Sequence, residues 1–317
     1  MNELLRKIAN TVIANLDNTT EIGLFKGRMG LTIFLYEYAR YSGNSVYEKM
    51  ADTLIDRIYT QFKPGISFSM IDGSASIGIG LSYLLRNHFI EGNIDNILQD
   101  LDRKLLDSSE DVLFKETTST IPVFSSGAYL LSRLPLCSVE QKEKWIMNII
   151  DTGISFMWKI IIRKKFEPKL SLLNSMFLVY NQLMKYNIDK ENVLQLQKDL
   201  LRLSVNALEK RYYQFSDILL LKYILPLVPK EISIDGQSRL RSLLSGINMD
   251  DFNIEEWNNG LWWCFVYDIT SLEYSIEAIE KYVDQKMLDY SFDLDDINSQ
   301  FSVLGLNLII KGGLRWI

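Results

Sequence analysis

The sequence has few of the residues from which active sites and cross-links are usually built. Its 317 residues include one histidine, His88, and two cysteines, Cys137 and Cys264. A single histidine excludes most catalytic histidine pairs and His-rich metal sites. The cysteines are far apart in apolar settings, so we expect no disulfide framework and interpret Cys264 as a small buried hydrophobic residue. His88 is interpreted as a partly exposed histidine at a helix end.

The sequence also lacks a basic surface and a long apolar run. Its net charge is −6 with lysine and arginine dispersed, which argues against a nucleic-acid partner. No stretch approaches the roughly 20 apolar residues of a membrane-spanning helix, and residues 1–16 alternate charge with apolar side chains instead of forming a signal peptide. We therefore expect a cytoplasmic protein without a membrane span. At 47% hydrophobic residues, the chain can bury a large core.

Helical periodicity dominates what is present. Six prolines and 17 glycines leave long stretches free of helix breakers, and apolar residues recur at helical spacing, as at Leu31, Phe34, Leu35 and Tyr38. Alternation typical of strands is nowhere sustained. The sequence therefore predicts an all-α fold.

An internal repeat organises these helices. A cluster of small residues leads into an apolar helix, an amphipathic helix follows, and the pattern returns after roughly 45 residues, about seven times in all. The amphipathic segments are 47–62, 94–105, 139–158, 191–208 and 275–288. No linker interrupts the pattern, so we predict one domain, residues 1–317, in which inner and outer helices form a closed α/α toroid. The apolar helices are expected to begin at GLFKGRMGL, GSASIGIGL, SSGAYLL, LSLLNSMF, YYQFSDILL, NNGLWWCF and FSVLGLNL.

Motifs of other enzyme classes are weak. The sequence GIG at 78–80 follows a serine-rich turn instead of a strand, which argues against a dinucleotide-binding fingerprint. No phosphate-binding loop of the Walker type occurs, and no Gly-x-Ser-x-Gly elbow accompanies the histidine. The glycines before the helices are interpreted chiefly as structural, because they allow close helix packing and tight turns.

The first two clusters resemble a known family. GLFKGRMGLTIFLYEYAR, followed by GSASIGIGLSYLLRNHFIEGNID, is similar to the first two repeats of lanthionine synthetase C-like (LanC-like) proteins. The similarity is strong over residues 22–105, moderate at 124–134, and weak but in phase beyond them. It implies an α/α toroid and enzymes that add a cysteine thiol to a dehydrated serine or threonine. That chemistry uses zinc to hold a thiolate and an acid/base group to move the proton.

The resemblance also implies where the functional residues would stand. By repeat phase, Gln214 occupies the first zinc-ligand position and Asp217 fits the aspartate of the same motif. Trp262 and Trp263 replace the Cys-His pair that completes the zinc site. Asn174 stands at the acid/base position. No catalytic residue, zinc or other cofactor is therefore expected.

Two further groups of residues have alternative interpretations. Acidic residues gather at 250–256 and 289–296, where solvated helix caps are a simpler explanation than a glycosidase carboxylate pair. Aromatic residues of the C-terminal half, Trp257, Trp316 and Tyr212 among them, either line an opening or fill the space of the lost zinc site. The predicted pocket comprises Asp72, Tyr213, Gln214, Asp217, Trp262, Trp263 and Asn174.

The leading hypothesis is a LanC-like pseudoenzyme, a non-catalytic binding or scaffolding component of modified-peptide biosynthesis. Its expected partner is a precursor peptide or a peptide-maturation enzyme. The alternative is a metal-free enzyme, for example a hydrolase, that uses carboxylates such as Asp217 or Asp72. An active thioether-forming cyclase is the third possibility.

Overall fold

The computed structural model describes the chain except for residues 1, 64, 72, 118, 120–121, 164–166, 212, 233, 248–253, 268–274, 289–293 and 312–317. The described residues form helices and no strand, which confirms the all-α prediction. Their contacts group into two compact units, residues 1–91 with 253–317 (unit 1) and residues 92–252 (unit 2). Closure into a toroid stays a prediction.

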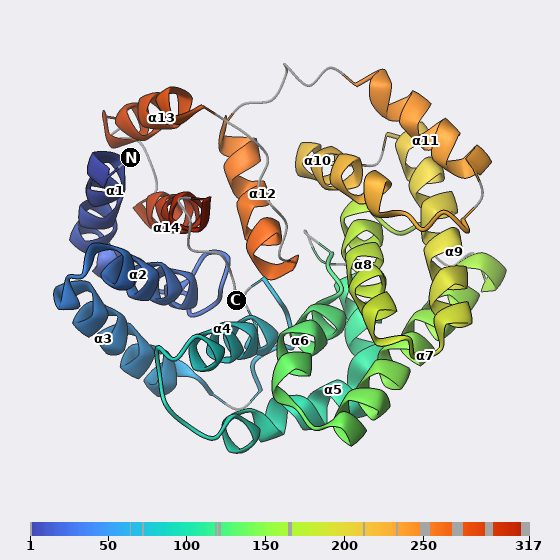
Figure 1. The fold of residues 1–317 in the computed structure, drawn as a ribbon, viewed down its shortest axis with the longest axis horizontal. Coiled ribbons are helices and arrows are strands. Elements are labelled where there is room, and N and C mark those ends of the chain that lie inside the picture. Colours follow the sequence, from blue (N-terminus) through green and yellow to red (C-terminus); the bar gives the residue numbers. More distant parts are fainter. Residues whose placement is uncertain are drawn as a thin grey trace. The chain divides into compact units, whose positions relative to one another are not determined.

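Unit 1 combines the two ends of the chain. Helix α14 packs against α1, α2 and α12, and α2 lies between α3 and α14 (Figure 1). Residues distant in sequence, such as Ile8, Phe34 and Phe301, are therefore fully buried in the same unit. Its helices are α1 (Asn2–Ala14), η1 (Leu16–Asn18), α2 (Arg28–Ser42), α3 (Ser45–Gln61), α4 (Ser74–Arg86), α12 (Ile254–Tyr267), α13 (Ile276–Leu288) and α14 (Leu294–Lys311).

Unit 2 is continuous in sequence, and α8 packs against α6, α9 and α10. Its helices are α5 (Ile94–Glu116), α6 (Ser125–Arg133), η2 (Leu134–Leu136), α7 (Val139–Arg163), α8 (Leu170–Leu183), η3 (Met184–Tyr186), α9 (Lys190–Glu209), α10 (Phe215–Ile224), η4 (Leu225–Leu227) and α11 (Ile234–Ser245).

Buried and amphipathic helices alternate along the chain, as the repeat predicts. Every residue of α2 from Arg28 to Ala39 is buried, and α8 is buried over almost its whole length. By contrast, α3 buries only one face, formed by Tyr47, Ala51, Leu54 and Ile58. That spacing is the one expected for a helix with a single apolar stripe.

Helix α5 is longer than the predicted amphipathic segment 94–105. It continues through the polar sequence that follows to Glu116. Within the extension, the Ser109 hydroxyl lies 2.7 Å from the Thr152 hydroxyl of α7 and donates to Asn148 Oδ1 at 3.0 Å. The polar sequence after residue 105 suggests the end of a helix, but hydrogen bonds to α7 allow α5 to continue.

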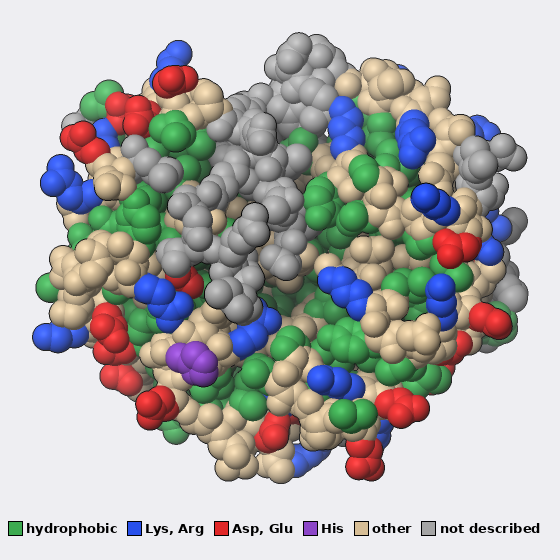
Figure 2. All heavy atoms as spheres, viewed as in Figure 1, with side chains coloured by type: hydrophobic (Ala, Val, Ile, Leu, Met, Phe, Trp, Pro, Cys, Tyr) green, Lys and Arg blue, Asp and Glu red, His purple; other side chains and the backbone are tan. Residues whose placement is uncertain are grey.

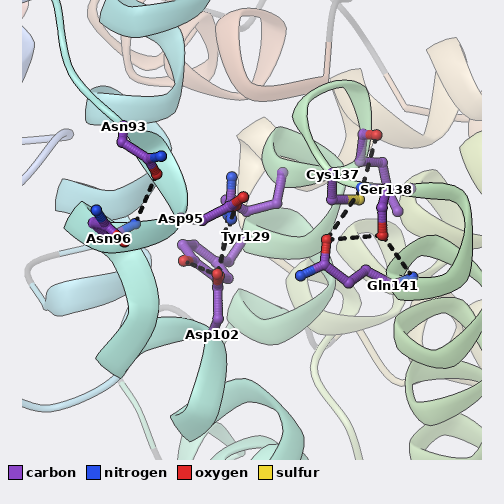
Figure 3. A network of polar contacts seen from close by, with 10 residues as sticks. Asn93, Asp95, Asn96, Asp102, Tyr129, Cys137, Ser138 and Gln141 are labelled. Carbon is purple, nitrogen blue, oxygen red and sulfur yellow. Dashed lines mark hydrogen bonds and ion pairs between the residues drawn. The ribbon is translucent and has the colours of Figure 1, made fainter.

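A buried ion pair joins α5 to α6. The Arg133 side chain is fully buried and donates to both carboxylate oxygens of Asp102, at 3.0 and 2.8 Å. Tyr129 Oη donates to the same carboxylate at 2.7 Å (Figure 3). The carboxylate neutralises the buried guanidinium through two of its nitrogens, while Arg133 Nη1 has no hydrogen-bond partner in the described structure.

Positively and negatively charged side chains are interspersed on the face shown in Figure 2, where the single histidine is exposed. His88 lies just beyond α4 with a left-handed backbone, φ 57°, as expected of a residue at a helix end. Within the described ranges no helix has both the length and the apolar character needed to cross a membrane.

Candidate functional site

A polar pocket lies within unit 2, where α8 and α10 begin. Its volume is about 530 Å³. Ser171 and Asp217 are its buried members, with 7% and 4% of their surfaces exposed. Together with the exposed side chains around them, the lining residues are Glu167, Pro168, Lys169, Ser171, Arg211, Tyr213, Gln214 and Asp217.

A reciprocal capping arrangement starts α10. The Gln214 side chain accepts a hydrogen bond from the Asp217 backbone N–H, and Asp217 Oδ2 accepts one from Gln214 N at 2.9 Å. Two N–H groups that have no partner within a helix are satisfied in this way. The motif therefore gives Asp217 a structural role at the first turn of α10.

Burial also changes the acidity of Asp217. Loss of hydration raises the pKa of its carboxyl group to about 6, although the hydrogen bond from Gln214 and the positive charge of Lys169 both lower it. An acid with this pKa exchanges protons near neutral pH, as a general acid or base must. The pocket therefore holds one carboxyl group with acid/base capability.

Asn174 lies directly behind this turn. It is 1% exposed, and its Nδ2 donates to the backbone oxygen of Asp217 at 2.8 Å. Asn174 Oδ1 has no hydrogen-bond partner in the described structure. The structure thus brings together four residues of the predicted pocket: Asn174, Tyr213, Gln214 and Asp217.

The Asn174 contact recurs in unit 1. Asn258 Nδ2 donates to Gln300 O at 3.0 Å, and Asn298 Nδ2 donates to Asn15 O at 2.6 Å. Asn174, Asn258 and Asn298 are each the fifth residue of their helix. An amide at this helical position therefore joins a buried helix to a distant part of the chain, and this contact gives Asn174 a structural role.

Trp262 and Trp263 belong to α12 of unit 1. They are 3% and 6% exposed, and both rings contact Phe25, with centroids 5.9 and 5.4 Å away. Trp263 also stacks on Tyr267. Their indoles are therefore core side chains of unit 1. Cys264, which follows them, is buried as expected.

Several predicted residues lie outside the described structure. They include Asp72 of the predicted pocket, together with Tyr212 and Trp316. The same holds for Asp250, Asp251, Asp289 and Asp293, and for the side chains of Glu255, Glu256, Trp257, Asp295 and Asp296.

Lys169, Ser171 and Arg211 are pocket residues that sequence reasoning missed. Lys169 is the N-cap residue of α8, and Arg211 ends the turn after α9 with φ 58°. The repeat phase points only to positions that match a motif of the family, and Lys169, Ser171 and Arg211 match none. A useful signal was the Gln214-x-x-Asp217 pattern, since a capping box marks a helix start.

The chemistry of the pocket is that of amides, hydroxyls, carboxylates and cations. Unit 2 contains one cysteine, Cys137, and no histidine. Among the residues whose positions are described, no three or more His, Cys, Asp or Glu side chains gather as a metal site would require. The expectation that the chain binds no zinc stays a prediction.

Comparisons with protein-family models, with curated proteins and with solved structures returned no match. The resemblance to LanC-like proteins thus remains an interpretation of the sequence motifs.

Proposed function

We propose that this chain is a non-catalytic relative of the LanC-like proteins that binds a precursor peptide or a peptide-maturation enzyme in the cytoplasm. The pocket at the starts of α8 and α10 supports this proposal most directly. Gln214 and Asp217 line it, and Asn174 lies directly behind them. Gln214 and Asn174 carry amides where the family has a thiolate and an imidazole, and Asp217 matches the family's own aspartate. Such groups recognise a peptide backbone by hydrogen bonds but do not activate a thiol.

The packing of α12 gives further support. At the positions where the resemblance expects a Cys-His pair, Trp262 and Trp263 are buried among aromatic side chains. Indole rings supply no lone pair for a metal, and their apolar contacts give them a role in the core. The substitution of both ligands by core residues is consistent with a retained fold and an abandoned reaction.

The test combines metal analysis with a cyclisation assay. The purified chain is incubated with zinc, desalted and examined by elemental analysis, and it is also mixed with a dehydrated peptide that carries a free cysteine. We expect no stoichiometric zinc and no loss of the free thiol. One zinc per chain or a new thioether would overturn the proposal.

Binding is tested with fluorescently labelled precursor-type peptides. Tyr213→Ala removes a large side chain from the pocket and is expected to weaken peptide binding about tenfold, since aromatic residues often dominate peptide affinity. Tyr186→Ala, at an exposed tyrosine of the same unit that is absent from the pocket lining, is the matched control. Equal affinities of the two variants would contradict peptide binding at this pocket.

A second function is favoured by one observation, the raised pKa of Asp217. A metal-free hydrolase would use this carboxyl group as its acid or base. Hydrolysis of model ester or glycoside substrates with a pH dependence near 6, abolished in Asp217→Asn, would support it. Absence of turnover leaves the binding function as the better account.

A further inference from the structure

The start of α8 is an uncapped helix N-terminus that faces the pocket. Its N-cap residue, Lys169, makes no side-chain cap, and Lys169 O accepts from the N–H groups of Leu172 and Leu173. The two preceding N–H groups, of Leu170 and Ser171, have no backbone partner in the described structure. Free N–H groups and the helix dipole together favour an anion at this end of a helix.

The hydroxyl of a buried serine at the same place gives an independent indication. Ser171 lines the pocket with 7% of its surface exposed, and its Oγ forms no hydrogen bond within the described part of the chain. Ser175, one turn further along α8, differs in this respect: its Oγ donates to Leu172 O at 2.9 Å and accepts from Phe124 N at 2.9 Å. Ser171 is thus a residue that is more than nine-tenths buried and that lines the pocket with a hydroxyl not used inside the protein, which leaves this hydroxyl available to a ligand.

The charged side chains around the pocket also favour an anion. Lys169 and Arg211 both line it, and the carboxylate of Glu167 pairs with Lys210. The remaining acid, Asp217, already accepts a hydrogen bond from Gln214 N. Burial raises its pKa to about 6, which reduces its negative charge at slightly acidic pH. The two cations and the α8 N-terminus therefore outweigh the single negative charge of Asp217.

We propose that the pocket binds an anionic group, a carboxylate or a phosphate, at the start of α8. The donors are the N–H groups of Leu170 and Ser171 and the Ser171 hydroxyl, while Lys169 and Arg211 supply the positive charge. This inference rests on the proposed binding function and specifies which group of the ligand the pocket recognises.

The experiment titrates the full chain with sodium phosphate and, separately, with sodium acetate at constant ionic strength. Sodium chloride is the reference, and the amide resonances of Leu170 and Ser171 are followed by nuclear magnetic resonance. We expect saturable shifts of both amides with at least one of the two anions. The anion that saturates at the lower concentration identifies whether phosphate or carboxylate is preferred.

Three variants locate the binding. Ser171→Ala is expected to weaken it about tenfold, since a hydrogen bond to a charged group is worth that much or more. Arg211→Ala should weaken it and reduce its salt dependence. Arg241→Ala, which removes an exposed cation of α11 away from the pocket, is expected to change nothing. Because the Ser171 hydroxyl has no partner in the described structure, the alanine variant should retain the wild-type melting temperature.

Failure of this inference can be told apart from failure of the proposed function. If neither anion shifts the two amides, or if Ser171→Ala binds as tightly as the wild type, the anion site is refuted. A peptide without any carboxylate that binds as well as its acidic counterpart would also refute it, while peptide binding would stand. Saturable anion binding together with no affinity for any precursor-type peptide would support the anion site and contradict the proposed function.

Discussion

At the scale of single residues, Asp217 links the stability of unit 2 to pH. Its carboxyl group is almost completely buried, and burial raises its pKa from the ordinary value of 3.8 to about 6. Between these two values the folded chain binds the proton more tightly than the unfolded chain does. Ionisation of Asp217 therefore disfavours the folded state, and this penalty develops as the pH rises from about 4 to above 6.

The substitution Asp217→Asn should remove that penalty. The asparagine side-chain oxygen can still accept from Gln214 N, so the capping contact is retained. Relative to the variant, the wild type should lose roughly 3 kcal/mol of stability between pH 4 and pH 7.5. Guanidinium unfolding of both proteins at the two pH values measures this difference. Asp151→Asn, at an exposed position of α7, is the control, and an equal response in both variants would contradict the assignment to Asp217.

Gln197 is a second residue whose burial has an energetic consequence. It is completely buried on α9, and neither Nε2 nor Oε1 has a hydrogen-bond partner in the described structure. Gln197→Leu should therefore stabilise the chain by about 1–2 kcal/mol, because it removes two unsatisfied polar atoms and keeps similar volume. Urea unfolding measures the change. Gln141→Leu should instead destabilise, since Gln141 Oε1 accepts from Ser138 N; a stabilised Gln141→Leu would contradict this reasoning.

At the scale of helices, close packing at Gly30 joins α2 to α12. A Cβ atom at Gly30 would lie 2.3 Å from the backbone oxygen of Leu24 and 2.7 Å from two ring carbons of Trp262, which is closer than real side chains pack. Gly260 offers the opposite case on α12, because a Cβ atom there would meet no described atom within 4 Å. A substitution at Gly30 therefore tests the effect of crowding, and one at Gly260 tests the higher helix propensity of alanine.

Alanine substitutions at these two positions should change stability in opposite directions. Gly30→Ala should lower the free energy of unfolding by about 1–3 kcal/mol through overpacking. Gly260→Ala should raise it by about 0.5–1 kcal/mol through helix propensity. Thermal unfolding followed by circular dichroism measures both. Stabilisation by both substitutions would contradict the overpacking of Gly30 against Leu24 and Trp262.

The helices themselves were largely predictable from the sequence. The segments 139–158 and 191–208 are confirmed as parts of α7 and α9, because their apolar stripes repeat at helical spacing. The polar extension of α5 was not expected, since its stabilising partners lie on another helix.

The candidate site was only partly predictable. Gln214, Asp217 and Asn174 of the predicted pocket contact one another in the structure, while their functional role stays a prediction. The repeat phase did not identify Lys169 or Ser171, because tertiary packing decides whether a side chain at the start of a helix faces a pocket.

At the scale of the molecule, unit 1 depends on both ends of the chain. Helix α14 packs against α1 and α2, and Gly305 of α14 lies against Ile8 and Phe34. Truncation after residue 252 removes α12 to α14 and exposes this apolar surface. Burial of such surface is the main source of stability for buried helices. We expect α2 to lose its protection from hydrogen exchange while α8 remains protected.

Hydrogen exchange with mass spectrometry reports both units in one experiment. The matched control ends after residue 311, so that α14 is retained, and it should preserve the protection of α2. Persistent protection of α2 in the shorter chain would show that residues 1–91 fold without the C-terminal helices.

The distribution of tryptophan between the units has an optical consequence. Trp145 and Trp158 belong to unit 2, whereas the other four tryptophans belong to unit 1, where Trp262 and Trp263 are almost completely shielded from water. A shielded indole emits at shorter wavelength than a solvated one. Replacing Trp145 and Trp158 with phenylalanine would leave a chain whose tryptophan fluorescence originates from one unit alone. This emission would be a built-in probe of the unfolding of unit 1 that needs no attached dye.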